Sequence, residues 1–253
     1  MQDIPQNHPR YHSLILRKKI SEAHKNGVLA ESGLIAHGRG EAFDYLLGEK
    51  TIPPAKKAIE AAATQLLLAK HPVISVNGNT TALSAREVVQ LSSEIEAPLE
   101  INLFYRTPDR VDKIEKILKN NGAKKVLGSI NQKYLPLNGL EGPRSLASME
   151  GIYQADVVLV PLEDGDRVQA LQDNGKTVIT VELNPISRTA KTSSITIVDN
   201  LIRALPLLIK QVQKLKVQER SRLVEIVEKF DNQENLKKSL EFILADFKDS
   251  VRS

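Results

Sequence analysis

The sequence predicts an α/β fold in which a mostly parallel sheet is covered by helices on both faces. From residue 72 onward, short runs rich in Val, Ile and Leu alternate with longer stretches of helical periodicity. The run VVLV at residues 157–160 is apolar throughout, as expected for a strand that is buried on both faces. Strands joined in this way by helices pair in parallel. We therefore expect a Rossmann-like three-layer α/β/α fold, with additional helices at the N-terminal and C-terminal ends.

Before residue 72 the sequence predicts helices only. Gly27 is placed to end the first of them, and a short apolar piece at residues 34–36 precedes the second. Pro53 and Pro54 open the third, whose many alanines allow close packing against a sheet. These helices are predicted at residues 9–26, 41–47 and 55–70.

The strands of the sheet are predicted by short apolar runs, at residues 72–76, 98–105, 123–127, 155–160, 177–183 and 195–198. Helices are expected between them, at 82–95, from 107, near 167–172 and from 200. Thr107 and Pro108 form a helix start, because a capping residue precedes a proline at the first helical position. Residues 128–151 show little periodicity and separate the third strand from the fourth.

The C-terminal part of the chain changes character and has no strand signal. Its apolar positions follow helical spacing, at Leu223, Ile226, Val227, Phe230, Leu236, Leu240, Ile243, Leu244 and Phe247. This spacing predicts two amphipathic helices that pack on the parent domain or on a second subunit. We therefore divide the chain into a main domain at residues 1–215 and a helical appendage at residues 216–253.

Composition excludes several classes of protein. The 253 residues are 41% hydrophobic and include no cysteine, which excludes disulfides, thiolate metal sites and a cysteine nucleophile. There is no apolar run of about 20 residues and no signal peptide at the start, so we expect a cytoplasmic protein without a membrane partner. Net charge is +4 but the basic residues are mixed with acids and aromatics are few, which argues against a nucleic-acid partner.

Two apparent nucleotide motifs lack the required context. Gly175-Lys176-Thr177 resembles the end of a P-loop, but it lies between a predicted helix and the next strand, whereas a P-loop runs from strand to helix. We interpret it as a helix stop. Gly38-Arg39-Gly40 begins a dinucleotide fingerprint, but Phe43 occupies the third glycine position. His8 and His12 have the spacing of a metal pair on a helix, yet Pro9 indicates that the helix starts between them, so we interpret them as surface residues.

Polar, glycine-containing loops follow five of the predicted strands. In open parallel sheets, ligands bind at the carboxyl ends of strands, where such loops converge. Any one of them is also explained by helix capping, since Asn, Asp and Thr are common helix-start residues. Arginine and amide-bearing loops suit phosphate oxygens, and an acid at a strand end suits ribose hydroxyls. The residues alone therefore predict binding of a phosphorylated metabolite or a nucleotide. The loops lie at 77–81, 102–110, 163–167, 182–189 and 199–200.

Seven longer segments are spread over most of residues 8–205, and together they are far more specific than any short motif. They are HPRYHSLILRKK, GLIAHGRGEAFDYLLGE, PVISVNGNTTAL, EINLFYRTPDRV, ADVVLVPLEDGDR, ELNPISRTA and ITIVDN. In this order they resemble the hallmark segments of the archaeal phosphopantothenate synthetases. The resemblance implies a homodimeric, ATP-dependent ligase of coenzyme A biosynthesis. Such an enzyme activates 4-phosphopantoate as an acyl-adenylate with release of diphosphate. β-Alanine then attacks to give 4′-phosphopantothenate and AMP.

The resemblance also implies a set of ATP contacts, namely Arg17, Arg39, Glu182, Leu183, Asn184, Arg188, Thr189, Asp199 and Asn200. The two N-terminal arginines are suited to neutralise the triphosphate and the departing diphosphate. Glu182 is suited to ribose hydroxyls, although Asp is more often expected there and the extra methylene changes the reach. Leu183 contributes its backbone only.

We assign the acid substrate to a second set of residues, Asn77, Asn79, Arg106, Arg110 and His37. Asp164 and Asp166 are candidates to hold Mg²⁺, directly or through water. Each of these has an alternative: Arg110 as a helix-surface ion-pair partner, the two aspartates as parts of a tight turn, and His37 as a structural histidine. No catalytic base is assigned.

Two other functions remain open at the level of sequence. The same loops suit a kinase or nucleotidyltransferase that acts on a small phosphorylated acid. They also suit a nucleotide sensor without catalysis, in which the C-terminal helices are the partner surface. The number of arginines favours chemistry, because a sensor has no leaving group to stabilise.

Overall fold

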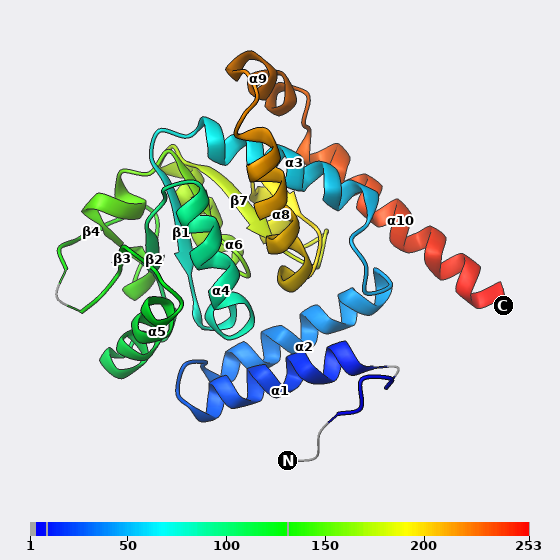
Figure 1. Ribbon diagram of the computed structural model, residues 1–253, viewed down its shortest axis with the longest axis horizontal. Coiled ribbons are helices and arrows are strands. Elements are labelled where there is room, and N and C mark those ends of the chain that lie inside the picture. The colour runs from blue at the N-terminus through cyan, green and yellow to red at the C-terminus, as the bar shows by residue number, and fades with distance from the viewer. Residues whose placement is uncertain (1–3, 9, 131, 253) are drawn as a thin grey trace.

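The fold is known from a computed structural model that describes residues 4–8, 10–130 and 132–252, the side chains of 246–252 excepted. At its centre is a parallel sheet of six strands in the order β3-β2-β1-β6-β7-β8 (Figure 1). Their bounds are β1 Pro72–Val76, β2 Leu99–Ile101, β3 Val126–Leu127, β6 Val157–Leu159, β7 Thr177–Val181 and β8 Ile195–Ile197. The chain runs outward from β1 to β3 and then crosses to β6 on the other side of β1. The predicted α/β class is confirmed.

Both faces of the sheet are buried, and alternate residues of each strand point to different layers. In β6, Val157 and Leu159 join the larger core, whereas Val158 joins a smaller core on the opposite face. The larger core lies under α3 (Pro53–Leu68), α4 (Gly78–Glu94), α5 (Pro108–Asn120) and α8 (Leu201–Leu215). The smaller core lies under α6 (Gly165–Asp173) and part of the segment between β3 and β6. This two-sided burial is why the central strands are apolar without alternation.

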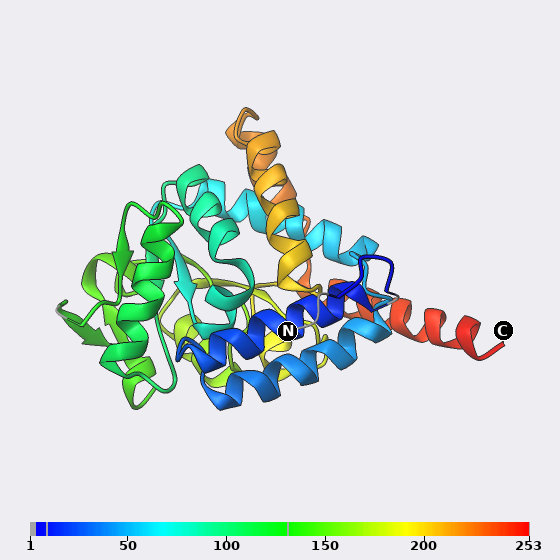
Figure 2. The same cartoon turned by 60° about the horizontal axis from the view of Figure 1, so that its bottom comes forward.

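The N-terminal helices differ from the prediction at one point. α1 (Tyr11–Lys25) ends before Gly27, whose φ of +73° suits glycine. The predicted short helix at 41–47 is the second half of α2 (Glu31–Leu46), which continues through Gly38 and Gly40. The sequence did not predict this because a glycine inside a helix is less favourable than an alanine by about 1 kcal/mol, so two glycines suggested a break. α1 and α2 lie below the sheet in Figure 1 and side by side in Figure 2.

α4 begins four residues earlier than its predicted start at residue 82. Asn77 caps it, because its Oδ1 accepts a hydrogen bond from Thr80 N at 3.0 Å. The segment at 77–81, interpreted from sequence as a loop, is therefore a cap and the first helical turn. The cap places the N-terminus of α4 directly after β1, at the carboxyl end of the strand beside which the strand order reverses.

The segment at 128–151 is not irregular throughout. It contains the antiparallel pair β4 (Tyr134–Pro136) and β5 (Leu146–Ser148), followed by the helical turn η2 (Met149–Tyr153). The buried carboxylate of Glu100 in β2 fastens it by accepting hydrogen bonds from Ser148 N at 2.8 Å and Ile152 N at 2.7 Å. These strands are too short to give periodicity, so sequence reasoning missed them. It also missed α7 (Arg188–Thr192), a single short helix inside a predicted loop.

The C-terminal helices are α9 (Arg220–Glu228) and α10 (Asn232–Arg252), as predicted. Leu223 belongs to the main core, and Leu236 and Ile243 form a cluster with Leu183 and Val198 of the main domain. These three side chains pack on the parent domain, whereas Leu244, predicted to share their face, is 57% exposed. Phe247, predicted to share this face, lies outside the described side chains. Within the part of the chain that the structure describes, no helix is both long and apolar enough to cross a membrane.

Candidate functional site

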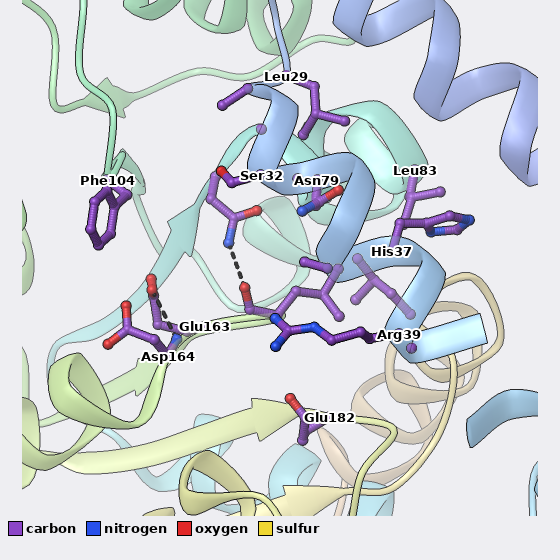
Figure 3. A pocket seen from close by; sticks show the side chains of 18 of the residues that line it. Leu29, Ser32, His37, Arg39, Asn79, Leu83, Phe104, Glu163, Asp164 and Glu182 are labelled. Atoms are coloured by element: carbon purple, nitrogen blue, oxygen red, sulfur yellow. Dashed lines mark hydrogen bonds between the residues drawn. The ribbon is translucent and has the colours of Figure 1, made fainter. Parts of the chain in front are cut away.

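A cavity of about 580 Å³ lies at the carboxyl ends of the strands, under α2. Its walls come from the residues that follow β1, β2, β6, β7 and β8, so it occupies the point where the strand order reverses. Figure 3 shows Arg39 reaching from α2 toward Glu182, with Glu163, Asp164 and Phe104 together on another side of the cavity. The fold thus brings together loops that are far apart in the sequence.

Most of the predicted site residues line this cavity. Of the predicted ATP contacts, these are Arg39, Glu182, Leu183, Asn184, Thr189 and Asn200. Of the residues predicted for the acid substrate and metal, these are His37, Asn77, Asn79, Arg110 and Asp164. The first group follows β7 and β8 or lies on α2, and most of the second follows β1, β2 or β6. Strand order therefore places the two groups toward different ends of one cavity.

The remaining predicted residues do not line it. Arg17 is in α1, where its Nε donates to Glu41 of α2 at 3.0 Å and its side chain is 44% exposed. Arg188 pairs with Asp166, and both side chains are mostly exposed. Glu41 does line the cavity, so Arg17 contacts the wall from behind. Binding by these residues stays a prediction.

Asp199 is fully buried and holds other residues in place. It accepts hydrogen bonds from the Thr51 hydroxyl at 2.6 Å and from Arg203 Nε at 2.9 Å. Arg203 also pairs with Asp44, which accepts a hydrogen bond from Asn200 Nδ2 at 2.8 Å. This network fixes Asn200 at the cavity wall. The position of Asp199 is that of a residue that orients Asn200.

Arg106 and Arg110 follow the same strand but have different surroundings. Arg106 stacks on Tyr134 and donates to Gly128 O and Tyr134 Oη, each at 2.8 Å, so it stabilises the segment after β3. Arg110 lines the cavity and donates from Nη1 to Tyr105 O at 2.6 Å. Its Nε is buried and has no partner among the described residues. Of the two, Arg110 has a donor available for an anion.

Burial changes the protonation of two cavity residues. It raises the pKa of Glu182, although Asn184 N donates to this carboxylate at 2.9 Å and Arg39 is nearby. It lowers the pKa of His37 below the ordinary value of 6.5, so the imidazole is neutral at pH 7. His37 Nε2 is buried without a partner among the described residues.

Sequence reasoning missed Glu163, which lines the cavity, and Arg144, which pairs with a lining residue. Glu163 lines the cavity and pairs with the fully buried Arg167 at 2.6 Å. Arg144 pairs with Asp164, and its guanidinium lies 4.2 Å from the centroid of the exposed Phe104 ring. Arg144 lies in the segment without periodicity, where nothing in the sequence indicated which strand it would approach. Glu163 stood beside the predicted Asp164 in a loop already recognised as a candidate.

The described residues contain no group of three or more His, Cys, Asp or Glu side chains arranged to hold a metal ion. Asp164 Oδ1 accepts from Arg167 N at 3.1 Å and so caps α6, while Oδ2 pairs with Arg144. Mg²⁺ needs only one or two carboxylates when substrate phosphates supply other ligands. Asp164 lines the cavity but has both oxygens engaged, and Asp166 lies outside the cavity lining, so metal binding by either residue stays a prediction.

The rejected P-loop motif is a helix stop, as interpreted. Gly175 follows α6 with a φ of +75°, and β7 begins at Thr177. Lys176 is buried, and its Nζ donates to Tyr153 O at 2.9 Å and Ala155 O at 3.0 Å. Its ammonium group is therefore hydrogen-bonded to the protein backbone and does not bind phosphate as a P-loop lysine does.

Comparison with known proteins agrees with this arrangement. Residues 54–246 match the family model described as phosphopantothenate/pantothenate synthetase. A protein of Thermococcus kodakarensis named "4-phosphopantoate--beta-alanine ligase" is 52% identical over 93% of this chain and 90% of its own length. A protein of the same name from Thermococcus onnurineus is 51% identical over 93% of this chain and 90% of its own length. Another, from Methanosarcina mazei, is 50% identical over 95% of this chain and 94% of its own length. The chain therefore belongs to the phosphopantothenate/pantothenate synthetase family.

Proposed function

We propose that this protein is a ligase that joins 4-phosphopantoate to β-alanine with ATP, giving 4′-phosphopantothenate, AMP and diphosphate for coenzyme A biosynthesis. The observation that carries the proposal is the shared name of relatives that are about half identical over nine-tenths of the chain. The cavity supports it, because one space holds both the residues suited to a nucleotide and those suited to a phosphorylated acid.

ATP is placed in the end of the cavity formed by β7, β8 and α2. Arg39 forms no hydrogen bond or ion pair with the described residues, so its guanidinium is available to phosphate oxygens. Glu182 is suited to ribose hydroxyls, and Asn200 is held in a fixed orientation at the wall. The acid substrate is placed beside β1 and β2, with its phosphate near Arg110 and the N-terminus of α4.

The proposed chemistry has two steps. In the first, a carboxylate oxygen of the acid attacks the α-phosphorus of ATP, and the bond to diphosphate breaks. Arg39 balances the negative charge that develops on the departing group. In the second step the amine attacks the carbonyl carbon, the carbon–nitrogen bond forms, and AMP leaves. The neutral imidazole of His37 is suited to take the proton that the ammonium must lose.

Mg²⁺ is proposed to accompany the triphosphate and to neutralise part of its charge, with Asp164 as the protein carboxylate that faces it. Because the proposed co-substrate is ATP, we place the enzyme in the cytoplasm. Neither a membrane nor a nucleic acid is among the proposed partners.

A homodimer is proposed as the working form. It is supported by apolar side chains on the outer surface of α2, where Ile35 is 63% exposed and Leu46 is 43% exposed, about three turns apart on the same face. Sedimentation equilibrium tests this directly. A mass of twice 28.0 kDa is expected, and a mass of 28.0 kDa at micromolar concentration would reject the dimer.

The decisive experiment identifies the nucleotide product. The protein is incubated with ATP, Mg²⁺, 4-phosphopantoate and β-alanine, and each substrate is omitted in turn. AMP that forms only when the acid is present, with an amide once β-alanine is added, is the expected result. ADP would indicate a kinase instead, and absence of turnover would indicate a nucleotide sensor.

A further inference from the structure

Asn102 is a buried cavity residue with an unused acceptor. It follows β2 directly, lines the cavity, and is only 4% exposed. Its backbone N donates to Val76 O at 3.0 Å, which ties it to the end of β1. Its side-chain Oδ1 is buried and has no hydrogen-bond partner among the described residues. A buried acceptor left without a donor is costly, so such an atom in a cavity wall indicates a ligand that supplies the donor.

The orientation of the Asn102 amide is fixed by the protein. Nδ2 donates to Leu146 O at 3.2 Å and to Arg144 O at 3.4 Å, and both acceptors are carbonyl groups. A flipped amide would place Oδ1 against these carbonyl oxygens, where no hydrogen bond can form. The free atom is therefore the oxygen, and the ligand group that meets it must be a donor.

The chemistry of the acid substrate offers one such group. 4-Phosphopantoate carries an ionised phosphate and an ionised carboxylate, which only accept hydrogen bonds, two methyl groups, and a hydroxyl on the carbon next to the carboxylate. Arg110, at the start of the helix that follows Asn102, lines the same cavity with an unpartnered Nε, and the proposed function assigns the phosphate to it. We propose that Asn102 Oδ1 accepts a hydrogen bond from this 2-hydroxyl and so selects 2-hydroxy acids as substrates. The inference rests on the proposed ligase function.

The test uses the acid and its deoxy analogue, 3,3-dimethyl-4-phosphooxybutanoate. With the wild-type protein, kcat/KM for the analogue is expected to fall at least about tenfold, because the buried oxygen stays unpaired. In Asn102→Ala the natural acid loses a similar factor, and the ratio between the two acids falls to about threefold or less. The KM for β-alanine stays unchanged. Equal use of both acids by the wild-type protein would overturn the inference without any variant.

A matched control separates recognition from loop support. Asn102→Ala also removes the hydrogen bonds to the backbone at residues 144 and 146, so it loosens the β5 segment. Ser145→Ala loosens the same segment by removing the hydrogen bond from Ser145 Oγ to Gly142 O at 2.7 Å, and Ser145 does not line the cavity. This control should keep the wild-type ratio between the two acids.

The outcomes distinguish this inference from the proposed function. If the wild-type protein forms no amide with 4-phosphopantoate, the proposed function fails. If it does, but Asn102→Ala keeps the full preference for the natural acid or instead raises the KM for β-alanine, then Asn102 does not read the hydroxyl and only this inference fails.

Discussion

At the scale of single residues, two arginines on neighbouring helices differ in what already neutralises them. Arg17 is paired with Glu41 and also donates to the Tyr45 hydroxyl at 3.4 Å. Arg39 has no such partner among the described residues and lines the cavity. Both arginines are implicated in ATP binding by resemblance, and the sequence could not rank them, because it does not show which of them meets a carboxylate in the free protein.

We predict unequal losses when these arginines are neutralised. Arg39→Gln should lower kcat/KM for ATP by roughly 100-fold, since it removes a charge-assisted contact to phosphate. Arg17→Gln should lower it by about tenfold or less, because this guanidinium must first leave Glu41. Steady-state kinetics with varied ATP measures both. Equal losses would mean that α1 shifts on nucleotide binding and delivers Arg17 to the phosphates.

The buried carboxyl of Glu182 should make both stability and ATP use depend on pH. Its pKa in the folded protein is raised by burial above the ordinary value of 4.5, so the unfolded chain loses this proton at lower pH than the folded one. The free energy of unfolding should therefore fall as pH rises from the ordinary value through the raised one. Over the same window kcat/KM for ATP should rise, since an ionised carboxylate accepts hydrogen bonds from ribose better.

Glu182→Gln tests both halves of that prediction, because glutamine does not ionise. Urea unfolding and kinetics across the acidic range should lose the dependence that belongs to this residue. If the variant keeps the wild-type pH profile of kcat/KM, then another group controls ATP binding.

At the scale of elements, the sequence predicted secondary structure best where a local rule, such as a helix cap, decides where an element begins. Pro53, Thr107 and Asn200 begin helices as their residue types indicated. The errors fell where tertiary contacts override local preference, as in α2, which accepts glycines, and in the short strands β4 and β5, which depend on Glu100. Arg144 approaches the cavity only through that segment, so no pattern in the sequence could place it.

Two glycines, Gly38 within α2 and Gly78 at the start of α4, provide a matched test of these elements. A Cβ on Gly38 in α2 would meet nothing within 4 Å, so Gly38→Ala should raise the free energy of unfolding by about 0.5 to 1 kcal/mol through helix propensity. A Cβ on Gly78 would lie 2.9 Å from Val28 O, a backbone atom before α2. Gly78→Ala should therefore destabilise the fold and displace the loop that covers the cavity.

Chemical denaturation and the KM for both substrates measure the two variants. Gly38→Ala should leave both KM values unchanged. A loss of stability in Gly38→Ala would show that another surface, such as a second subunit, covers this position.

At the scale of the whole molecule, α10 supports the end of the cavity formed by β7 and β8, which is the end proposed for the nucleotide. Asn232 at the start of α10 accepts from Thr196 N at 2.8 Å and donates to Ser193 O at 2.9 Å. Leu236 packs in one cluster with Leu183, a cavity residue. The proposed boundary between residues 215 and 216 thus separates segments that share a core.

We predict that Asn232→Ala lowers the free energy of unfolding by about 1 to 3 kcal/mol, because it leaves buried backbone groups near β8 without partners. The KM for ATP should rise more than that for 4-phosphopantoate, since β8 lies next to β7 and away from β1 and β2. Differential scanning calorimetry and kinetics measure these effects. Asn121→Ala, at the exposed end of α5, is the control and should change neither KM.

The packing of α3 delays completion of the core until the end of synthesis on the ribosome. This helix is synthesised early, but the helices that cover it, α8, α9 and α10, are the last to emerge. Until then its row of buried alanines has no cover, so the nascent chain cannot complete its core during synthesis. We expect stalled nascent chains that end before residue 200 to be cleaved by protease within α3, and released chains that include α8, α9 and α10 to be protected.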